Sequence, residues 1–405
     1  MRIALLTNEY PPYIYGGAGV HVEYLTRELT RIERGQEVQV LCFGDQHCEQ
    51  GNLQLEGIEP PFQSQGKDPR HLKFFDTLAR NLDMAGQLEN IDIVHCHTWY
   101  THFAGCLLKQ LTGAKLVLTT HSLEPHRPWK VEQLGTAYQA SAWVERTAYE
   151  NADGVIAVSN SMRADVHSLY GVQPEKIRVI HNGIDLEQYC PTHKPEVLSQ
   201  YGIDPNRPYI LFVGRITRQK GIIHLVEAVR HLKSELQVVL CAGAPDTPEI
   251  GREMAEKVNK VRSESKNQII WIPQVVPKDD LIPIYSGASL FVCPSVYEPF
   301  GIINLEAMAC GTPVVASSVG GIKEVVVPGQ TGTLVEFEAG PHGDFEPRDP
   351  GLFARNLAAA IDQLISDPCK LKEMGIRSRE RVEHEFGWPS IARFTLDFYR
   401  DLVQA

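Results

Sequence analysis

Short apolar runs alternate with longer amphipathic segments through the first half of the chain. Between the runs, apolar residues recur at helical spacing over residues 20–30, and a second helix is predicted for residues 141–151. Strands are predicted for residues 3–6, 38–42, 93–95, 116–119, 154–158 and 178–180. Strands and helices that alternate in this way are typical of a parallel sheet covered by helices.

The alternation weakens over residues 185–208, which contain four prolines, and then begins again. Further strands are predicted for residues 209–213, 237–241, 269–272, 290–293, 314–316 and 332–335. The interruption predicts a linker between two domains of similar size. We therefore expect an α/β protein with two doubly wound, Rossmann-like domains, over residues 1–190 and 191–387.

Two further segments complete the expected architecture. Residues 336–351 are polar and rich in proline and glycine, which predicts an exposed loop. The last segment, residues 388–405, is amphipathic and predicts a closing helix that packs on another element. Its expected apolar face consists of Ile391, Phe394, Phe398 and Leu402.

Composition and charge exclude several classes of protein. The chain has 405 residues, 43% hydrophobic and 22% charged, as in globular proteins. The net charge of −11 argues against nucleic-acid binding. Residues 1–190 carry 16 Lys and Arg against 23 Asp and Glu, which argues against docking on a membrane. The N-terminal apolar run is too short for a signal peptide, and no run reaches the ~20 residues of a membrane span. A cytoplasmic protein is expected.

The nine cysteines are irregularly spaced and form no C-x-x-C pair. This pattern favours neither a zinc knuckle nor a disulfide scaffold. Most of the cysteines are expected to be small buried hydrophobic residues.

A glycine-rich segment that includes Gly16 and Gly17 follows the first predicted strand and opens the first helix. Glycines there allow a close approach of the backbone to a ligand, and the helix N-terminus attracts anions. The segment lacks the G-x-G-x-x-G fingerprint, which argues against a nicotinamide-dependent oxidoreductase or epimerase. A plain turn from strand to helix is the alternative.

Two cations follow the predicted strand 209–213. Arg215 and Lys220 therefore lie at the C-terminal edge of the second sheet, where open α/β sheets bind ligands. Both side chains are suited to a diphosphate, the arginine through paired hydrogen bonds and the lysine as a point charge. Solvated surface charge is the alternative.

A pair of glutamates follows the strand 290–293. Gly301 lets backbone N–H groups face a ligand, and Glu306 lies further along the next helix, within reach of ribose hydroxyls. A helix over this span would separate Glu298 from Glu306 by ~12 Å, beyond the roughly 5–9.5 Å of hydrolytic pairs. This disfavours a hydrolase without excluding it, because Pro299 interrupts the helix. A charge that stabilises a helix N-terminus is the alternative for Glu298.

Histidines cluster behind two strands of the first domain. His97 and His121 follow strands that face the same expected cleft, and an imidazole there suits proton exchange or hydrogen bonding beside a sugar. For His95 and His102 a packed or exposed side chain is expected. A metal site is the rival interpretation of these histidines, but it lacks a convincing H-E-x-x-H motif or Cys/His cluster.

Taken in order, these segments resemble the retaining GT-B glycosyltransferases, in the large family with glycogen synthase-like and sucrose synthase-like members. The motif is Glu298-x7-Glu306, with Gly214-Arg215-x4-Lys220 upstream and the Gly16-Gly17 loop near the start. Residues 9–22, 121–125, 127–130 and 241–249 further resemble the actinobacterial-type glycogen synthase group, which includes enzymes that make maltose 1-phosphate. The likeness covers nearly the whole chain and fades over residues 46–70 and after residue 336.

The resemblance implies a GT-B fold, with two domains facing a central cleft and a C-terminal helix crossing back to the first domain. It implies that residues 191–387 bind the nucleotide sugar and that the first domain binds the acceptor. It also implies retention of the anomeric configuration without a metal or cofactor.

The resemblance also implies roles for individual residues. The residues implied in donor binding are Gly16, Gly17, Arg215, Lys220, Glu298, Phe300, Gly301, Ile302 and Glu306. The catalytic candidates are Arg215, Lys220, Glu298 and His121, and His121 would hydrogen-bond the donor sugar near the reacting carbon. The cations would neutralise the leaving nucleoside diphosphate, Glu298 would hold the donor sugar and Glu306 the ribose. Acceptor candidates are His97, Tyr100, Arg127, Lys130 and Arg163. Arg127 and Lys130 suit an acceptor phosphate, with surface charge as the alternative.

The expected function is the transfer of glucose, with ADP-glucose favoured, to a glucan or to glucose 1-phosphate. Other hexosyltransferases that use UDP- or GDP-sugars with another small sugar or polysaccharide remain open, as does a protein that only binds nucleotide sugars. The base of the donor, the acceptor and the oligomeric state are not predicted.

Overall fold

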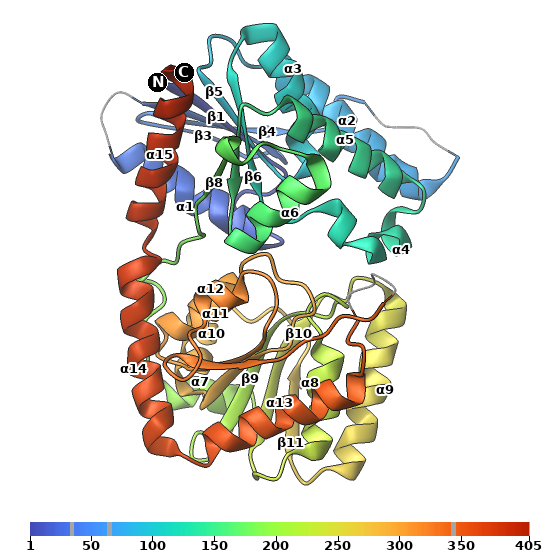
Figure 1. Cartoon of the computed structure of the whole chain (residues 1–405), viewed down its shortest axis with the longest axis vertical. Coiled ribbons are helices and arrows are strands. Elements are labelled where there is room, and N and C mark those ends of the chain that lie inside the picture. The colour runs from blue at the N-terminus through green and yellow to red at the C-terminus, as the bar shows by residue number, and fades with distance from the viewer. Residues whose placement is uncertain (33–35, 63–66, 342–345, 405) are drawn as a thin grey trace. The chain divides into compact units, whose positions relative to one another are not determined.

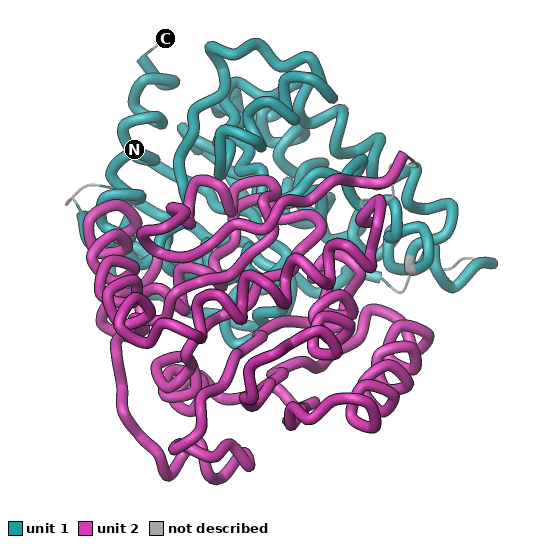
Figure 2. Tube along the Cα trace, turned by 60° about the horizontal axis from the view of Figure 1, so that its bottom comes forward, with its two compact units in different colours: residues 1–183, 388–405 teal, residues 184–387 magenta. Residues whose placement is uncertain are grey.

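The computed structural model describes residues 1–32, 36–62, 67–341 and 346–404. It divides into two compact units, shown in teal and magenta in Figure 2. Unit 1 contains residues 1–183 together with residues 388–405, and unit 2 contains residues 184–387. Each unit is built on one sheet.

The sheet of unit 1 has the strand order β3-β4-β2-β1-β5-β6-β7-β8. Every neighbouring pair is parallel except β3 and β4, which are antiparallel. The strands are β1 (Arg2–Thr7), β2 (Glu37–Phe43), β3 (His47–Gln50), β4 (Leu53–Ile58), β5 (Ile93–His97), β6 (Lys115–Thr120), β7 (Gly154–Ala157) and β8 (Ile177–Val179). The expected parallel sheet is confirmed. The pattern did not predict β3, whose side chains are mostly exposed, or β4, in which buried, half-buried and exposed positions are mixed.

Helices lie on opposite sides of this sheet (Figure 1). On one side α1 packs against α15, and on the other α2, α3 and α5 pack together. The helical segments are α1 (Gly17–Ile32), α2 (Pro69–Gly86), η1 (Trp99–Thr101), α3 (His102–Thr112), η2 (Glu124–His126), η3 (Pro128–Lys130), α4 (Val131–Leu134), α5 (Ala137–Asn151), α6 (Asn160–Tyr170), η4 (Pro174–Lys176) and α15 (Trp388–Gln404).

The C-terminal helix α15 belongs to unit 1, as the family resemblance implies. Trp388, Ile391 and Leu396 are buried in the core that α1 and β1 share, and Tyr399 Oη lies 2.6 Å from His95 Nδ1. One residue of the expected apolar face differs. Phe394 is 57% exposed, because Thr395 and Leu396 occupy the buried side of the helix instead.

Unit 2 has an all-parallel sheet with the strand order β11-β10-β9-β12-β13-β14. The strands are β9 (Tyr209–Arg215), β10 (Gln237–Gly243), β11 (Gln268–Ile272), β12 (Leu290–Cys293), β13 (Val314–Ser317) and β14 (Gly332–Val335). The helical segments are α7 (Pro195–Gln200), α8 (Ile222–Ala228), η5 (Val229–His231), α9 (Pro248–Glu264), α10 (Lys278–Gly287), α11 (Ile302–Ala309), α12 (Ile322–Val325), α13 (Pro350–Ile365) and α14 (Pro368–Glu385). The near-continuous apolar strands are buried on both faces, as expected for a parallel sheet.

All nine cysteines are free, and five of them are buried, in agreement with the prediction that they form no disulfide scaffold. Among the described residues, the helices are all too short or too polar to cross a bilayer.

Candidate functional site

An ion pair joins two loops at the C-terminal edge of the unit 2 sheet. Lys220 follows β9, Glu298 follows β12, and Lys220 Nζ lies 2.7 Å from Glu298 Oε2. Ser295 donates a hydrogen bond of 3.2 Å to the same oxygen. Both side chains are largely buried, with 19% and 8% of their surfaces exposed. The sheet therefore brings together a cation and a carboxylate that are 78 residues apart in the sequence.

The backbone of Glu298 is held as firmly as its side chain. The Gly321 N–H donates to Glu298 O over 3.0 Å. A Cβ on Gly320, whose φ is +47°, would lie 2.0 Å from that same carbonyl oxygen. The chain after β13 consequently passes directly against the loop that carries Glu298, and only glycine fits at this crossing.

Arg215, the second cation, is the last residue of β9. Its Nη1 donates to Asp246 Oδ1 over 2.7 Å, and 27% of the arginine side chain is exposed. Asp246 lies beyond the end of the neighbouring strand β10, and its side chain is 7% exposed. The sequence reasoning did not assign Asp246 to the site, although it lies in the segment 241–249 that carried the family resemblance.

Glu306 lies on α11 and accepts two tyrosine hydroxyls. Tyr189 Oη lies 3.1 Å from Oε1, and Tyr285 Oη lies 2.8 Å from Oε2. Burial raises the pKa of Glu306 above the usual value, while these hydrogen bonds oppose the rise. Each carboxylate oxygen keeps a second lone pair, so Glu306 remains able to accept a ligand hydroxyl.

The residues just before Glu306 form the start of α11. Phe300 is buried, Gly301 stands at the N-cap with φ +103°, and Ile302 is the first helical residue. The unsatisfied N–H groups at a helix start attract negatively charged or hydroxyl ligands.

The glycine loop of unit 1 is organised by Glu9. Glu9 Oε2 accepts the backbone N–H groups of Tyr15 and Gly16 at 2.9 and 2.7 Å. Gly17 is the first residue of α1. The Gly16 N–H is therefore already hydrogen-bonded within the loop, a role for Glu9 that the sequence reasoning did not identify.

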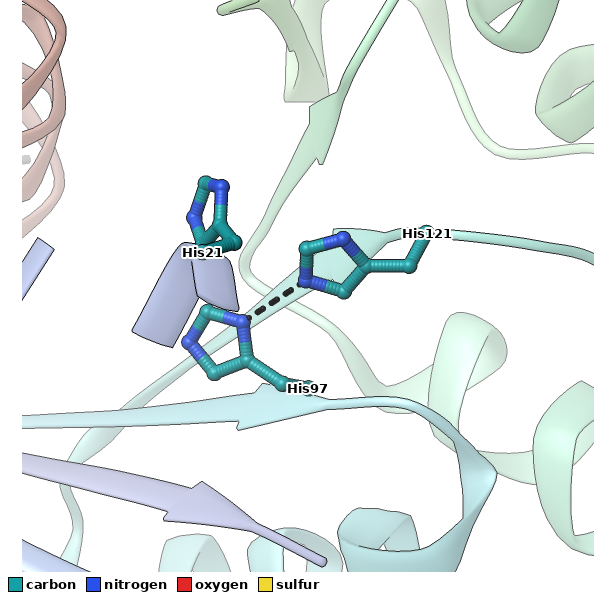
Figure 3. Close-up of side chains that lie close together, drawn as sticks. All are labelled: His21, His97 and His121. Atoms are coloured by element: carbon teal, nitrogen blue, oxygen red, sulfur yellow. Dashed lines mark hydrogen bonds between the residues drawn. The ribbon is translucent and has the colours of Figure 1, made fainter. Parts of the chain in front are cut away.

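Three histidines converge at the C-terminal edge of the unit 1 sheet (Figure 3). His97 ends β5, His121 follows β6, and His97 Nδ1 lies 3.0 Å from His121 Nε2. His21 reaches them from α1, with its ring centroid 5.4 Å from that of His97 and 4.8 Å from that of His121. The sequence reasoning did not select His21, although it lies in the segment that carried the family resemblance.

Burial keeps these imidazoles neutral. It lowers the pKa of His21 to about 4 and holds the pKa values of His97 and His121 well below the usual value. His95 is fully buried between Tyr399 Oη and Thr119 Oγ1, at 2.6 Å from each, and is a packed histidine.

The remaining acceptor candidates occupy different environments. Lys130 is buried, with Nζ 2.5 Å from Glu124 Oε1 and 5.9 Å from the centroid of the Tyr100 ring. Arg127 donates to Ser122 Oγ at 3.4 Å, and its buried Nε has no hydrogen-bond partner among the described residues. Arg163 is exposed on α6 and donates to Pro174 O at 3.5 Å. Tyr100 and Lys130 thus lie together.

Comparison with known proteins identifies the family. A model described as Glycosyltransferase Family 4 matches residues 15–188, and one described as Glycosyl transferases group 1 matches residues 193–342. The alpha-maltose-1-phosphate synthase of Mycolicibacterium smegmatis is 46% identical over 404 residues, which cover 99% of this chain and 99% of that protein. The chain belongs to the family 4 glycosyltransferases.

Two further comparisons agree with this family assignment. A glycogen synthase of Mycobacterium tuberculosis is 29% identical over 429 residues, covering 98% of this chain and 94% of that protein. The solved structure of sucrose-phosphate synthase from Thermosynechococcus elongatus matches with a TM-score of 0.78 at 26% identity, over 100% of this chain and 99% of that one. The expected GT-B fold is confirmed, and the protein is a sugar transferase rather than an oxidoreductase, an epimerase or a protein that only binds nucleotide sugars.

Proposed function

We propose that this glycosyltransferase moves glucose from ADP-glucose to glucose 1-phosphate, with retention of configuration, and releases maltose 1-phosphate and ADP. The observation that carries the proposal is the 46% identity, over the full length, to a protein named alpha-maltose-1-phosphate synthase. The glycogen synthase relative is markedly more distant, at 29% identity.

In this proposal unit 2 binds the nucleoside diphosphate. Arg215 and Lys220 stabilise the negative charge that grows on the leaving ADP, so each contributes more in the transition state than in the ground state. Asp246 and Glu298, which pair with these cations in the structure, hold the two side chains in place before the donor binds. Glu306 accepts ribose hydroxyls.

Glu298 and the start of α11 hold the transferred sugar in the same proposal. The Glu298 carboxylate accepts hydrogen bonds from the hydroxyls of glucose. The backbone N–H groups of Phe300, Gly301 and Ile302 donate hydrogen bonds to those hydroxyls. Gly16 and Gly17 border the diphosphate. His121 is neutral, and because its Nε2 is hydrogen-bonded to His97 Nδ1, its Nδ1 is the ring nitrogen left for the donor sugar.

In this proposal Arg127 of unit 1 binds the phosphate of the acceptor. Its buried Nε has no protein partner among the described residues, so a phosphate oxygen would satisfy it. Lys130 is ion-paired with Glu124, and its ammonium group lies over the Tyr100 ring. In this proposal Lys130 positions Tyr100 and adds positive charge to the acceptor site. His97 is hydrogen-bonded to His121, and Arg163 is more exposed than the other acceptor candidates.

The chemical step breaks the bond between the glucose C1 and the β-phosphate oxygen of ADP-glucose. It forms a bond from C1 to the O4 hydroxyl oxygen of glucose 1-phosphate. The proton of that hydroxyl passes to the departing diphosphate, so atoms and charge balance in this step. The protein positions both sugars and stabilises the leaving group.

Nucleoside diphosphate release is the measurement that tests the proposal. ADP-, UDP- and GDP-glucose would each be incubated with glucose 1-phosphate, glycogen or fructose 6-phosphate, and the phosphorylated products separated by mass. We expect ADP-glucose with glucose 1-phosphate to give the highest kcat/KM and a disaccharide phosphate. Turnover with other pairs and none with this pair would overturn the assignment.

Elongation of a glucan is the second candidate. It is supported by the glycogen synthase relative, which is 29% identical over nearly the whole chain. Incorporation of glucose into glycogen, with no disaccharide phosphate formed, would favour this candidate.

A further inference from the structure

Three imidazoles of unit 1 form a cluster, and the proposed function gives only one of them, His121, a contact with the donor sugar. His21 comes from α1, His97 from the end of β5 and His121 from the segment after β6. One ring nitrogen from each lies within 4.8 Å of the other two. Figure 3 shows the three rings grouped around a common space.

The hydrogen bonds of the cluster leave lone pairs available. His21 Nδ1 lies 2.7 Å from Asn182 Oδ1, an acceptor, so Nδ1 carries the proton and Nε2 keeps its lone pair. One proton bridges His97 Nδ1 and His121 Nε2, 3.0 Å apart, and a cation that replaced it would meet a lone pair from each ring. His97 Nε2 is buried and has no partner among the described residues.

The chemistry of the three ligating side chains selects a particular class of cation. All three ligands are imidazoles, which suit Zn²⁺, Ni²⁺ and Cu²⁺, whereas Mg²⁺ and Ca²⁺ prefer oxygen. Zinc–nitrogen bonds of about 2.0–2.1 Å in tetrahedral geometry put ligand nitrogens roughly 3.3 Å apart. The separations in this cluster bracket that value, from 3.0 Å to within 4.8 Å. Small rotations of the rings would satisfy it.

We propose that His21, His97 and His121 form a three-imidazole site for a divalent transition metal of the zinc class, and that the bound ion competes with the sugar donor. The competition rests on the proposed function, because it requires His121 to contact the donor sugar. Metal binding itself does not depend on that function. Three protein ligands leave the fourth tetrahedral position open to water.

Binding is tested with cobalt as a spectroscopic probe. The full chain, stripped with a chelator, would be titrated with Co²⁺ at neutral pH. We expect one ion per chain, the intense visible bands of tetrahedral Co²⁺, and their loss when Zn²⁺ is added. Because the chain has nine free cysteines, a thiolate-to-cobalt charge-transfer band would show a different site and overturn the proposal. So would the absence of the tetrahedral spectrum.

Two histidine variants identify the ligands. His21→Gln should weaken Co²⁺ binding by at least about tenfold. His167→Gln is the matched control, since His167 belongs to the same unit but lies on α6, where its Nδ1 is hydrogen-bonded to Val172 O and not to the cluster. Equal affinity in wild type and His21→Gln would overturn the site. If His21→Gln does not fold, the spectrum of the wild-type protein decides the question by itself.

Kinetic measurements separate metal binding from competition with the sugar donor. Zn²⁺ should raise the KM for the nucleotide sugar, a chelator should restore it, and Mg²⁺ should have no such effect. Metal binding without a change in donor KM would overturn the competition, and with it the placement of His121 on the donor. Transfer activity in a protein that binds no Co²⁺ would overturn the metal site and leave the proposed function intact.

Discussion

Lys220 and Glu298 form an ion pair of 2.7 Å between the loops that follow two adjacent strands, β9 and β12. Ser295 completes the arrangement by donating to the same carboxylate oxygen. The pair fixes the positions of a cation and of a carboxylate that can accept hydrogen bonds before any ligand binds. Electrostatic catalysis needs this pre-organisation.

Removing the cation of this pair should abolish most of the transfer activity. We expect Lys220→Ala to lower kcat by about 10²–10³, because one preorganised charge no longer stabilises the leaving diphosphate. Glu298→Ala should have a similar effect, and the double variant should lose less than the sum, because the two residues act as a unit. Lys260→Ala, at an exposed position on α9, is the control. Unaltered turnover in Lys220→Ala would refute the assignment.

Arg127 provides a test of the acceptor. Arg127→Ala should raise the KM for glucose 1-phosphate by about 10- to 100-fold, the value of one or two charge-assisted hydrogen bonds. The KM for the nucleotide sugar should change little. Arg400→Ala, on the partly exposed side of α15, is the control. An equal loss with a glucan acceptor, which has no phosphate at the growing end, would show that Arg127 acts on something else.

The sequence pattern was sufficient for the architecture because most of the parallel strands contain a short apolar run. It failed at β3, which is mostly exposed and pairs antiparallel with β4, and at β4, in which buried, half-buried and exposed positions are mixed. It also assigned Phe394 to the buried face of α15, where a helical period alone cannot separate neighbouring faces.

The candidate residues were found by their position after a strand, and the residues that were missed act through contacts between elements. Glu9 and Asp246 each hold a selected group, Gly16 and Arg215, by hydrogen bonds that no local motif encodes. His21 joins the other histidines only because α1 packs beside the strand ends. The burial of Lys130 against Glu124 depends on tertiary packing in the same way.

Glu145 should make the stability of the protein depend on pH. Burial raises its pKa to about 8 from the usual 4.5 of a glutamate, so between these values the folded state retains a proton that the unfolded state has lost. The free energy of unfolding therefore falls as pH rises through this window, by up to about 1.4 kcal/mol per pH unit.

Urea unfolding at pH 5 and pH 8 measures this dependence. Glu145→Gln keeps an oxygen that accepts the Glu124 N–H but removes the titration, so it should shrink the difference in stability between the two pH values. Glu150→Gln, an exposed glutamate on the same helix, should leave the difference as it is in wild type. An unchanged difference in Glu145→Gln would show that Glu145 is ionised in the folded state.

Buried histidines should destabilise the fold in acid. Burial lowers the pKa of His21 to about 4 and of His102 to about 3, and holds those of His95 and His97 well below 6.5. The unfolded chain takes up these protons near pH 6.5, so stability is lost as pH falls below that value. Each histidine contributes up to about 1.4 kcal/mol per pH unit.

His102→Phe isolates one of these contributions. Both ring nitrogens of His102 are buried without a hydrogen-bond partner among the described residues, so an apolar ring of similar shape should be tolerated. We expect a shallower loss of stability between pH 6.5 and pH 4 than in wild type, measured by urea unfolding. The same slope in both proteins would contradict a neutral buried His102.

Two glycine variants separate the crossing at Glu298 from ordinary backbone strain. Gly320 and Gly329 both have positive φ, +47° and +76°, but only at Gly320 would a Cβ meet a backbone atom, Glu298 O at 2.0 Å. Gly329→Ala should cost about 1–2 kcal/mol of stability and leave kcat unchanged. Gly320→Ala carries the same strain and must also push the Glu298 loop away, so it should lose more stability and lower kcat. Calorimetry and the diphosphate-release assay on both variants measure the two effects. Equal behaviour of the two alanine variants would mean that the contact with Glu298 O is not what requires a glycine at position 320.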